Sequence, residues 1–232
     1  MDKWITFDCY GTLVDWRTGM GNSLEIVAPG RGADMLSLHR KIEGEIEMQE
    51  AYRPYREVLA ESVRRMARSL QLPLGPGDEE ILAATLPFWP VYPDTNEALL
   101  ELKRAGWKLA ILSNVDRDLI TGTLRHFSCL IDLVVTAQDV RSYKPADAHA
   151  RRFLELTGVS SDRWLYAAVN LQYDLRPGRA LGANCVWINR EREPMPDDPD
   201  ILFGESAGMS GLPRIAAQFE MSRSVSQAGE RK

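Results

Sequence analysis

From Tyr92 onward the chain alternates short apolar runs with longer amphipathic segments, and no other feature limits the possible folds as strongly. The apolar runs predict buried strands over 108–112, 133–136, 164–169 and 185–188. The segments between them predict helices, and an apolar run over 4–7 predicts one more strand. Strand–helix–strand repetition is typical of a parallel sheet covered by helices on both faces. We therefore expect an α/β fold.

The segment 17–90 interrupts this alternation with helical periodicity and almost no strand signal. It predicts an all-helical insertion between the first strand and the rest of the sheet. Within it an apolar stripe has helical spacing and predicts packing inside the insertion, with a homodimer seam as the alternative; it consists of Leu59, Val63, Met66 and Leu70. We expect a core over 1–16 and 91–221, and a disordered polar tail over 222–232.

Composition narrows the function classes. The 232 residues carry a net charge of −5, which gives no support to a nucleic-acid or membrane partner. No transmembrane span or signal peptide is recognisable. The three cysteines are scattered and lack metal-ligand spacing, which fits a reduced cytoplasm. We expect a cytoplasmic protein, and we interpret Cys9 as a small core residue.

Polar side chains follow four of the predicted strands. Because parallel strands share one carboxyl edge, these side chains can converge there. Each has a simpler interpretation as a helix cap or a solvated surface residue. The combination favours a site, and its members are Asp8, Thr12, Ser113, Asn114, Lys144, Asn170 and Asp174. We interpret His39, His126 and His149 as surface or helix residues instead.

The four strand-end segments resemble the motifs of the haloacid dehalogenase (HAD) superfamily. The matching segments are Asp8-Cys9-Tyr10-Gly11-Thr12-Leu13, Leu112-Ser113-Asn114, Tyr143-Lys144-Pro145 and Asn170 to Asp174. The resemblance implies a Rossmann-like core, a nucleophilic Asp8, and a helical cap after the first motif. The predicted insertion over 17–90 lies where that cap belongs.

Residue 10 separates the subfamilies. HAD phosphatases have an acid/base aspartate there and bind Mg²⁺, whereas this chain has Tyr10 and few carboxylates for a hard cation. The form Asp-x-Tyr-Gly-Thr-Leu resembles the type II 2-haloacid dehalogenases instead. Segments 28–32, 109–114 and 186–190 are also similar to that family. In the family a cap arginine eleven residues after the Pro of the Pro-Gly-Arg-Gly segment receives the halide, and Arg40 stands at that position. Its simpler interpretation is a solvated helix arginine or a partner of Glu43 or Glu47 at helical spacing.

The resemblance implies hydrolysis of short (S)-2-haloacids to (R)-2-hydroxyacids through an ester on Asp8, without a metal or another cofactor. Lys144 would keep Asp8 ionised and Asp174 would activate water. Substrate contacts are assigned to Tyr10, Thr12, Ser113, Asn114 and Asn170. Three positions depart from well-known dehalogenases, because Ala150, Val169 and Leu171 stand where those enzymes have Tyr, Ser and Asn.

Two alternatives remain open at this point. One is a Mg²⁺-dependent HAD phosphatase acting on a small phosphate ester, which EDTA would inactivate. The other is a catalytically silent HAD fold that binds a partner through its helical insertion. Halide release from 2-haloacids and phosphate release from a phosphate ester, each measured with and without EDTA, distinguish all three.

Overall fold

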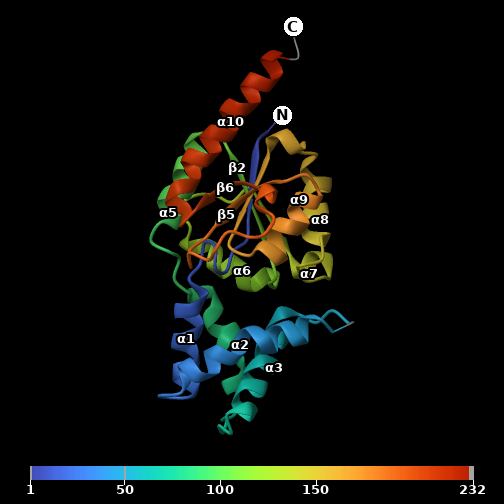
Figure 1. The fold of residues 1–232 in the computed structure, drawn as a ribbon. Helices are drawn as coiled ribbons and strands as arrows, with labels where there is room; N and C mark the ends of the chain where they lie inside the picture. Colours follow the sequence, from blue (N-terminus) through green and yellow to red (C-terminus); the bar gives the residue numbers. More distant parts are fainter. Residues whose placement is uncertain (1, 50, 230–232) are drawn as a thin grey trace.

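A six-stranded sheet forms the centre of the computed structural model, which describes residues 2–49 and 51–229 (Figure 1). The strand order is β3-β2-β1-β4-β5-β6, and every pairing is parallel. The strands are β1 (Trp4–Phe7), β2 (Lys108–Ser113), β3 (Leu133–Thr136), β4 (Trp164–Ala168), β5 (Asn184–Ile188) and β6 (Leu202–Ser206). The predicted α/β fold with a parallel sheet is confirmed.

The edge strand β6 is absent from the prediction. Its sequence Leu-Phe-Gly-Glu-Ser contains an interior glycine and two polar residues, and none of its five residues is fully buried. Phe203 and Glu205 are exposed, so one face of β6 is not covered and the strand needs no continuous apolar run. Periodicity alone therefore missed it.

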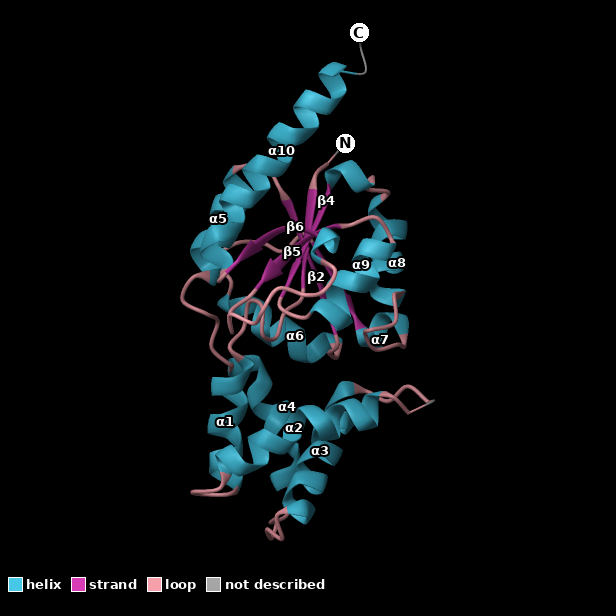
Figure 2. Cartoon of the chain, in the orientation of Figure 1, coloured by secondary structure: helices cyan, strands magenta, loops and turns pink. Residues whose placement is uncertain are grey.

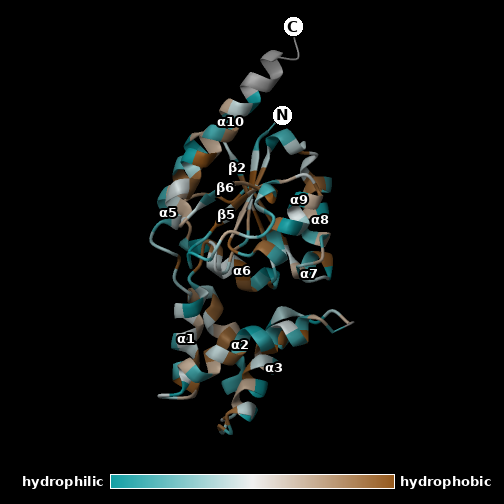
Figure 3. Cartoon of the chain, viewed as in Figure 1, coloured by the Kyte–Doolittle hydropathy of each residue, from teal (hydrophilic) through white to brown (hydrophobic). Residues whose placement is uncertain are grey.

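Helices cover both faces of the sheet (Figure 1). One face packs against α5 (Thr95–Arg104), α6 (Arg117–Thr123) and α10 (Leu212–Gly229), and the other against α8 (Ala148–Thr157). Two short helices, α7 (Ala137–Val140) and α9 (Arg176–Ala180), complete the core. Along β1 the alternation is direct, because Ile5 and Phe7 face the first layer while Trp4 faces the second. Figure 3 shows the central strands as predominantly hydrophobic.

The helices between β1 and β2 form a separate group, which we call the cap and define as residues 16–88. It contains α1 (Trp16–Val27), α2 (Gly32–Glu47), α3 (Tyr55–Ser69), α4 (Ile81–Thr85) and three-residue turns over 78–80 and 86–88. Figure 2 shows it to be entirely helical beside the mixed core. Leu59, Val63 and Met66 are fully buried within this chain, so their stripe packs inside the cap and is not a dimer surface.

The cap is fixed to the carboxyl edge of the sheet by hydrogen bonds from core loops. The buried carboxylate of Asp116 accepts from the backbone N–H groups of Tyr55 and Arg56, at 2.8 and 2.9 Å. These are free N–H groups of the first turn of α3, which its own N-cap Pro54 cannot satisfy with a side chain. Tyr143 also donates its hydroxyl to the Arg53 carbonyl at 2.8 Å. Asp116 of the core thus serves as the N-terminal hydrogen-bond acceptor of α3 in the cap.

The C-terminal helix differs from the predicted tail. α10 continues to Gly229, so residues 222–229 are helical rather than disordered, and 230–232 lie outside the described residues. Ile215 and Phe219 anchor the first turns on the core. The following residues include no proline, and they extend a helix that is already nucleated. No helix within the described ranges is long and apolar enough to cross a bilayer.

Candidate active site

Asp8 lies directly after β1, at the carboxyl edge of the sheet. The chain turns sharply there, because Gly11 takes a φ of 106° and the Leu13 N–H donates back to the Cys9 carbonyl at 2.8 Å. The turn leaves Asp8 only 9% exposed, with its carboxylate facing a cavity. Cys9 is fully buried, and burial together with the Asp8 charge raises the pKa of its thiol, as expected for a core residue.

Lys144 connects the first and last motifs. Its ammonium Nζ, in a side chain 6% exposed, lies 2.8 Å from Asp8 Oδ1, 2.6 Å from Asp174 Oδ1 and 2.9 Å from the Leu112 carbonyl. Burial alone would lower the pKa of Lys144, but the two carboxylates outweigh it and raise that pKa. An ammonium has three N–H donors, so these three acceptors use all of them. Lys144 therefore orients Asp8 and has no donor left for a substrate.

Asp174 lies in a π-helical turn over Leu171–Leu175, where the Leu175 N–H reaches back to the Asn170 carbonyl at 3.3 Å. Its Oδ1 accepts from both Lys144 and the buried Tyr166 hydroxyl, the latter at 2.8 Å. Burial, only partly offset by Lys144, raises the pKa of Asp174 to about 6. Within the described residues its Oδ2 has no hydrogen bond, so it is free to accept from water.

Two more predicted residues, Thr12 and Asn114, hold Asp8 and Lys144 in place, and a third, Ser113, lines the cavity. Thr12 donates its hydroxyl to Asp8 Oδ2 at 3.1 Å and does not line the cavity, so it positions the carboxylate rather than a substrate. Asn114 bonds both backbone groups of Lys144, accepting from its N–H at 2.8 Å and donating to its carbonyl at 3.2 Å. Ser113 lines the cavity, and its hydroxyl has no hydrogen-bond partner in the described part of the chain. Ser113 is therefore the predicted residue with a hydroxyl available to a ligand.

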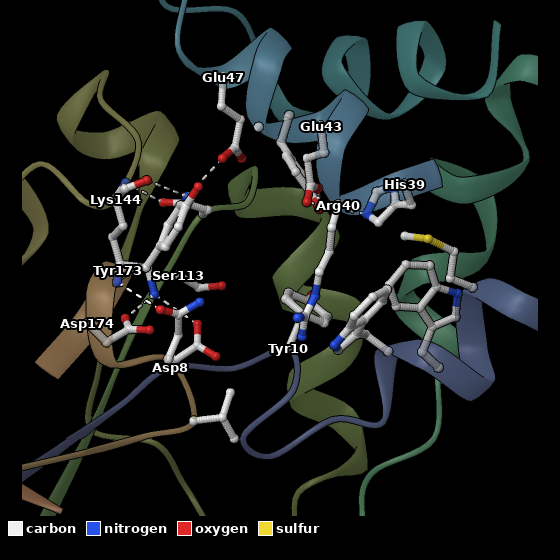
Figure 4. Close-up of a pocket in the computed structure, with 18 residues that line it drawn as sticks. Asp8, Tyr10, His39, Arg40, Glu43, Glu47, Ser113, Lys144, Tyr173 and Asp174 are labelled. Carbon is white, nitrogen blue, oxygen red and sulfur yellow. Dashed lines mark hydrogen bonds and ion pairs between the residues drawn. The ribbon is translucent and has the colours of Figure 1, made fainter. Parts of the chain in front are cut away.

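A cavity of about 350 Å³ lies between the sheet edge and the cap. Arg40 reaches into it from α2, opposite Asp8 and toward Tyr10 (Figure 4). The Arg40 guanidinium lies 5.7 Å from the Trp16 ring centroid and makes no hydrogen bond or ion pair within 2–49 and 51–229. The sequence-predicted Arg40 thus faces Asp8 across the cavity with no ion-pair partner among the described residues.

Apolar and aromatic side chains surround that cation. Tyr10 turns its ring to the cavity, while its hydroxyl bonds Thr123 at 2.9 Å and its edge packs on Trp89. Trp16 and Met20 of α1 complete this part of the wall. Tyr10 therefore contributes a surface and not a free hydroxyl. An apolar wall with few polar groups is the usual lining of a small-molecule site.

The rest of the cap wall is polar and was not predicted. His39, 2% exposed, lies 3.3 Å from Glu43 through Nε2, and Tyr55 donates its hydroxyl to Glu43 at 2.6 Å. Glu47 accepts from Asn114 at 3.4 Å. His39 is a helix residue, one of the two interpretations given for it, but it is not on the surface, because α2 presents it to Trp16 and the cavity.

The other two histidines differ in burial. His149 is also buried, with Nε2 3.2 Å from the Ser113 carbonyl, and burial followed by the Lys144 charge lowers its pKa to about 3. It is a neutral core residue rather than a surface one. His126 is exposed, as predicted.

The structure also places Asn170 and two of the positions that differ from well-known dehalogenases, Val169 and Ala150. The Asn170 carboxamide oxygen accepts from the N–H groups of Gln172 and Tyr173, both at 2.9 Å, and so caps the π-helical turn that carries Asp174. Asn170 and Val169 line the cavity, whereas Ala150 is buried among core side chains. Tyr166, on β4, donates its hydroxyl to Asp174. Its signal in the sequence was its place in a strand that ends near the motif.

The donor set does not fit Mg²⁺, the metal that the phosphatases of this fold use. Asp8 and Asp174 both point one oxygen at the Lys144 ammonium, which takes the place between them. Octahedral Mg²⁺ requires several oxygen ligands in near-ideal geometry. Among the described residues no group of three or more His, Cys, Asp or Glu side chains is arranged to hold a metal ion.

Comparisons with known proteins agree with this geometry. The family model of the haloacid dehalogenase-like hydrolases matches residues 3–166. (S)-2-haloacid dehalogenase 4A of Burkholderia cepacia is 28% identical over 193 residues, which cover 81% of this chain and 83% of that protein. A phosphoserine phosphatase of Thermus thermophilus is 31% identical, but the match covers only 50% of this chain and 49% of the phosphatase. The crystal structure of an L-2-haloacid dehalogenase superposes with a TM-score of 0.82 at 26% identity, covering 92% of this chain and 97% of that one. This chain belongs to the haloacid dehalogenase-like hydrolases.

Proposed function

We propose that this protein is a hydrolase acting on carbon–halide bonds, which converts short (S)-2-haloalkanoic acids to 2-hydroxyacids. One observation carries the proposal: an oriented carboxylate, Asp8, faces the Arg40 guanidinium across a small cavity, and Arg40 forms no hydrogen bond or ion pair with any described residue. The named dehalogenases among its relatives and structural neighbours support it.

In the first step a carboxylate oxygen of Asp8 attacks the halogen-bearing carbon from the side opposite the halogen. A C–O bond forms, the carbon–halogen bond breaks, and the halide leaves with the bonding electrons. Lys144 and Thr12 fix the orientation of Asp8, and the resulting inversion at carbon gives the (R)-hydroxyacid. Arg40 stabilises the negative charge that grows on the halogen.

In the second step water attacks the carbonyl carbon of the Asp8 ester. Asp174 accepts the water proton on its free Oδ2. The ester C–O bond then breaks on the Asp8 side, the hydroxyacid takes a proton, and Asp8 keeps one oxygen from water. Halide is a competent leaving group, so neither step needs a metal ion, in agreement with the misfit for Mg²⁺.

The substrate carboxylate requires donors other than Lys144, whose three N–H groups are occupied. We propose that the Ser113 hydroxyl supplies one. Asn114, Thr12 and Asn170 act through the loops and carboxylates that they hold. Of the five residues predicted for substrate binding, this leaves Ser113 and the ring of Tyr10 in direct contact.

Halide release from chloroacetate and from each enantiomer of 2-chloropropionate tests the proposal. We expect turnover of the (S)-enantiomer, unchanged by EDTA, and none in Asp8→Asn. Asp78→Asn, at a carboxylate that does not line the cavity, is the matched control and should keep full activity. Under single-turnover conditions in ¹⁸O-water the label should enter Asp8 before the product. Mg²⁺-dependent phosphate release from p-nitrophenyl phosphate without halide release would replace this proposal with a phosphatase.

A further inference from the structure

The side chain of Tyr166 reaches Asp174 from inside the sheet. Tyr166 lies on β4, beside Thr6 of β1, and is 2% exposed. Its hydroxyl donates to Asp174 Oδ1 at 2.8 Å. Tyr166 does not line the cavity, so it makes no contact with a ligand bound there. Any part that Tyr166 takes in the reaction must therefore act through Asp174.

The Tyr166 ring is held in place by its neighbours. The Trp164 ring lies nearly parallel to it, with the two centroids 6.3 Å apart and the planes at 20°. Helix α9 passes so closely that a Cβ at Gly178 would lie 2.5 Å from Tyr166 Cδ1. Only a residue without a side chain permits that approach. A hydroxyl on a ring packed in this way stays directed at Asp174.

The two carboxylate oxygens of Asp174 have different surroundings. Oδ1 accepts from the Tyr166 hydroxyl at 2.8 Å and from Lys144 Nζ at 2.6 Å. These two donors use both lone pairs of Oδ1. Oδ2 accepts from none of the residues that the structure describes, so it is the oxygen left for a proton from water.

The Tyr166 hydroxyl also favours the ionised form of Asp174, because it donates to the charged carboxylate. Burial raises the pKa of Asp174 to about 6, and Lys144 and Tyr166 counteract that increase. The hydroxyl itself stays protonated, because burial and then the Asp174 charge raise the pKa of Tyr166 above its ordinary value. Asp8 and Cys185 also face Asp174, and Cys185 is a neutral thiol because burial raises its pKa to about 12.

We propose that Tyr166 is a positioning residue for hydrolysis of the Asp8 ester. Its hydroxyl holds Asp174 in the ionised form and leaves Oδ2 to take the proton of the attacking water. This rests on the proposed function, in which Asp174 is the base of the second step. Formation of the ester requires no base, so Tyr166 should affect the second step and not the first.

Tyr166→Phe removes the hydroxyl and keeps the ring. Single-turnover kinetics with (S)-2-chloropropionate separate the two steps, because quenched samples analysed by mass spectrometry show the Asp8 ester form and decay. We expect its decay to slow about tenfold, the factor for one hydrogen bond to a charged group, and its formation to change less than about twofold. An ester that decays at the original rate would overturn the proposal, as would an equal slowing of both steps.

Thr6→Val is the matched control. Thr6 pairs with Tyr166 across the two strands, and its buried hydroxyl accepts from Trp164 Nε1 at 2.9 Å. The variant therefore loses a buried hydrogen bond of the same sheet, but not one to Asp174. Formation and decay of the ester should keep their original rates. If Tyr166 only stabilises the sheet, the two variants will behave alike, and that result overturns the proposal.

An NMR titration separates this inference from the proposed function. Aspartate labelled with ¹³C at the carboxyl group reports the ionisation of Asp174, whose signal is the one missing from Asp174→Asn. The pKa of Asp174 should be higher in Tyr166→Phe than in the original protein, and an equal or lower pKa would overturn the inference. If the original protein releases no halide, the proposed function fails, while the titration still decides whether Tyr166 holds Asp174 ionised.

Discussion

Replacing Lys144 by methionine tests the core of the site most directly. The side chain is buried, and its ammonium bonds Asp8 and Asp174 at 2.8 and 2.6 Å. Methionine fills a similar volume and removes the charge, which leaves two adjacent buried carboxyl groups without a cation. Removing one partner of a buried ion pair costs about 3–5 kcal/mol. We expect the free energy of unfolding to fall by about that amount at pH 8.

The sign of the pH dependence follows from proton linkage. Without Lys144 the folded-state pKa values of the two carboxyl groups rise above their unfolded value of about 3.9. The folded variant then binds more protons than the unfolded chain, so its stability decreases as the pH rises through those pKa values. The deficit relative to the original protein should therefore be larger at pH 8 than at pH 5.

Urea unfolding followed by tryptophan fluorescence at both pH values measures this deficit. Lys108→Met is the matched control, because Lys108 also pairs with an aspartate, Asp132 at 3.4 Å, but with a half-exposed side chain. Its loss should stay within about 1 kcal/mol at either pH. A deficit for Lys144→Met that is no larger than this, or one that is equal at pH 5 and pH 8, would refute the assignment of Lys144 as counter-ion to both carboxylates.

Four further predictions concern the cavity and the cap. Arg40→Met should lower kcat/KM for halide release by about 10²–10³ without changing Tm, whereas Lys41→Met on the exposed side of α2 should change neither. The kcat should rise with pH around or below 6, because Asp174 must be ionised to accept the water proton and esterification of Asp8 removes a charge that raises the pKa of Asp174; a limb above pH 7 would contradict this. The kcat/KM for chloroacetate should fall as Glu47 ionises near pH 9 and repels the anion, and Glu47→Gln should lack that limb. Asp116→Ala should lower the free energy of unfolding by about 1–2 kcal/mol in urea titrations, since it uncaps α3, and Asp116→Asn should restore most of it.

The sheet could be predicted wherever its strands are buried on both faces. Four runs after Tyr92 and the run over 4–7 are continuous apolar stretches because helices cover both of their sides. β6 has an interior Gly204 and exposes Phe203 and Glu205, so no buried apolar run marks it, whereas β3 at the other edge of the sheet has one. The C-terminal helix was missed for a related reason: its polar end is continued from turns that pack through Ile215 and Phe219, and composition alone does not report that anchoring.

The charged residues at the sheet edge were predictable because their positions follow from topology. Asp8, Lys144 and Asp174 come after strands that share one edge, so sequence order fixes their convergence. The roles of Thr12 and Asn114 were open until their partners were known. Their hydrogen bonds go to Asp8 and to the Lys144 backbone, and no spacing rule distinguishes those contacts from contacts with a substrate.

The cap wall could not be predicted in the same way. His39, Glu43 and Glu47 lie on a helix whose polar and apolar residues are both partly buried, and only docking on the core decides which face meets the cavity. Arg40 was found through a resemblance at one position. From the residues alone, the simpler interpretation was a solvated arginine or a partner of Glu43 or Glu47 on the helix surface.

The core and the cap both contribute charged side chains to the cavity, and together they set its net charge. The core contributes two carboxylates and one ammonium, so at neutral pH it is negative by one charge, with Asp174 above its pKa of about 6. In the cap Arg40 balances Glu43, and Glu47 stays protonated. A simple 2-haloacid anion therefore enters a cavity of its own sign, and only Arg40 and local hydrogen bonds offset the repulsion.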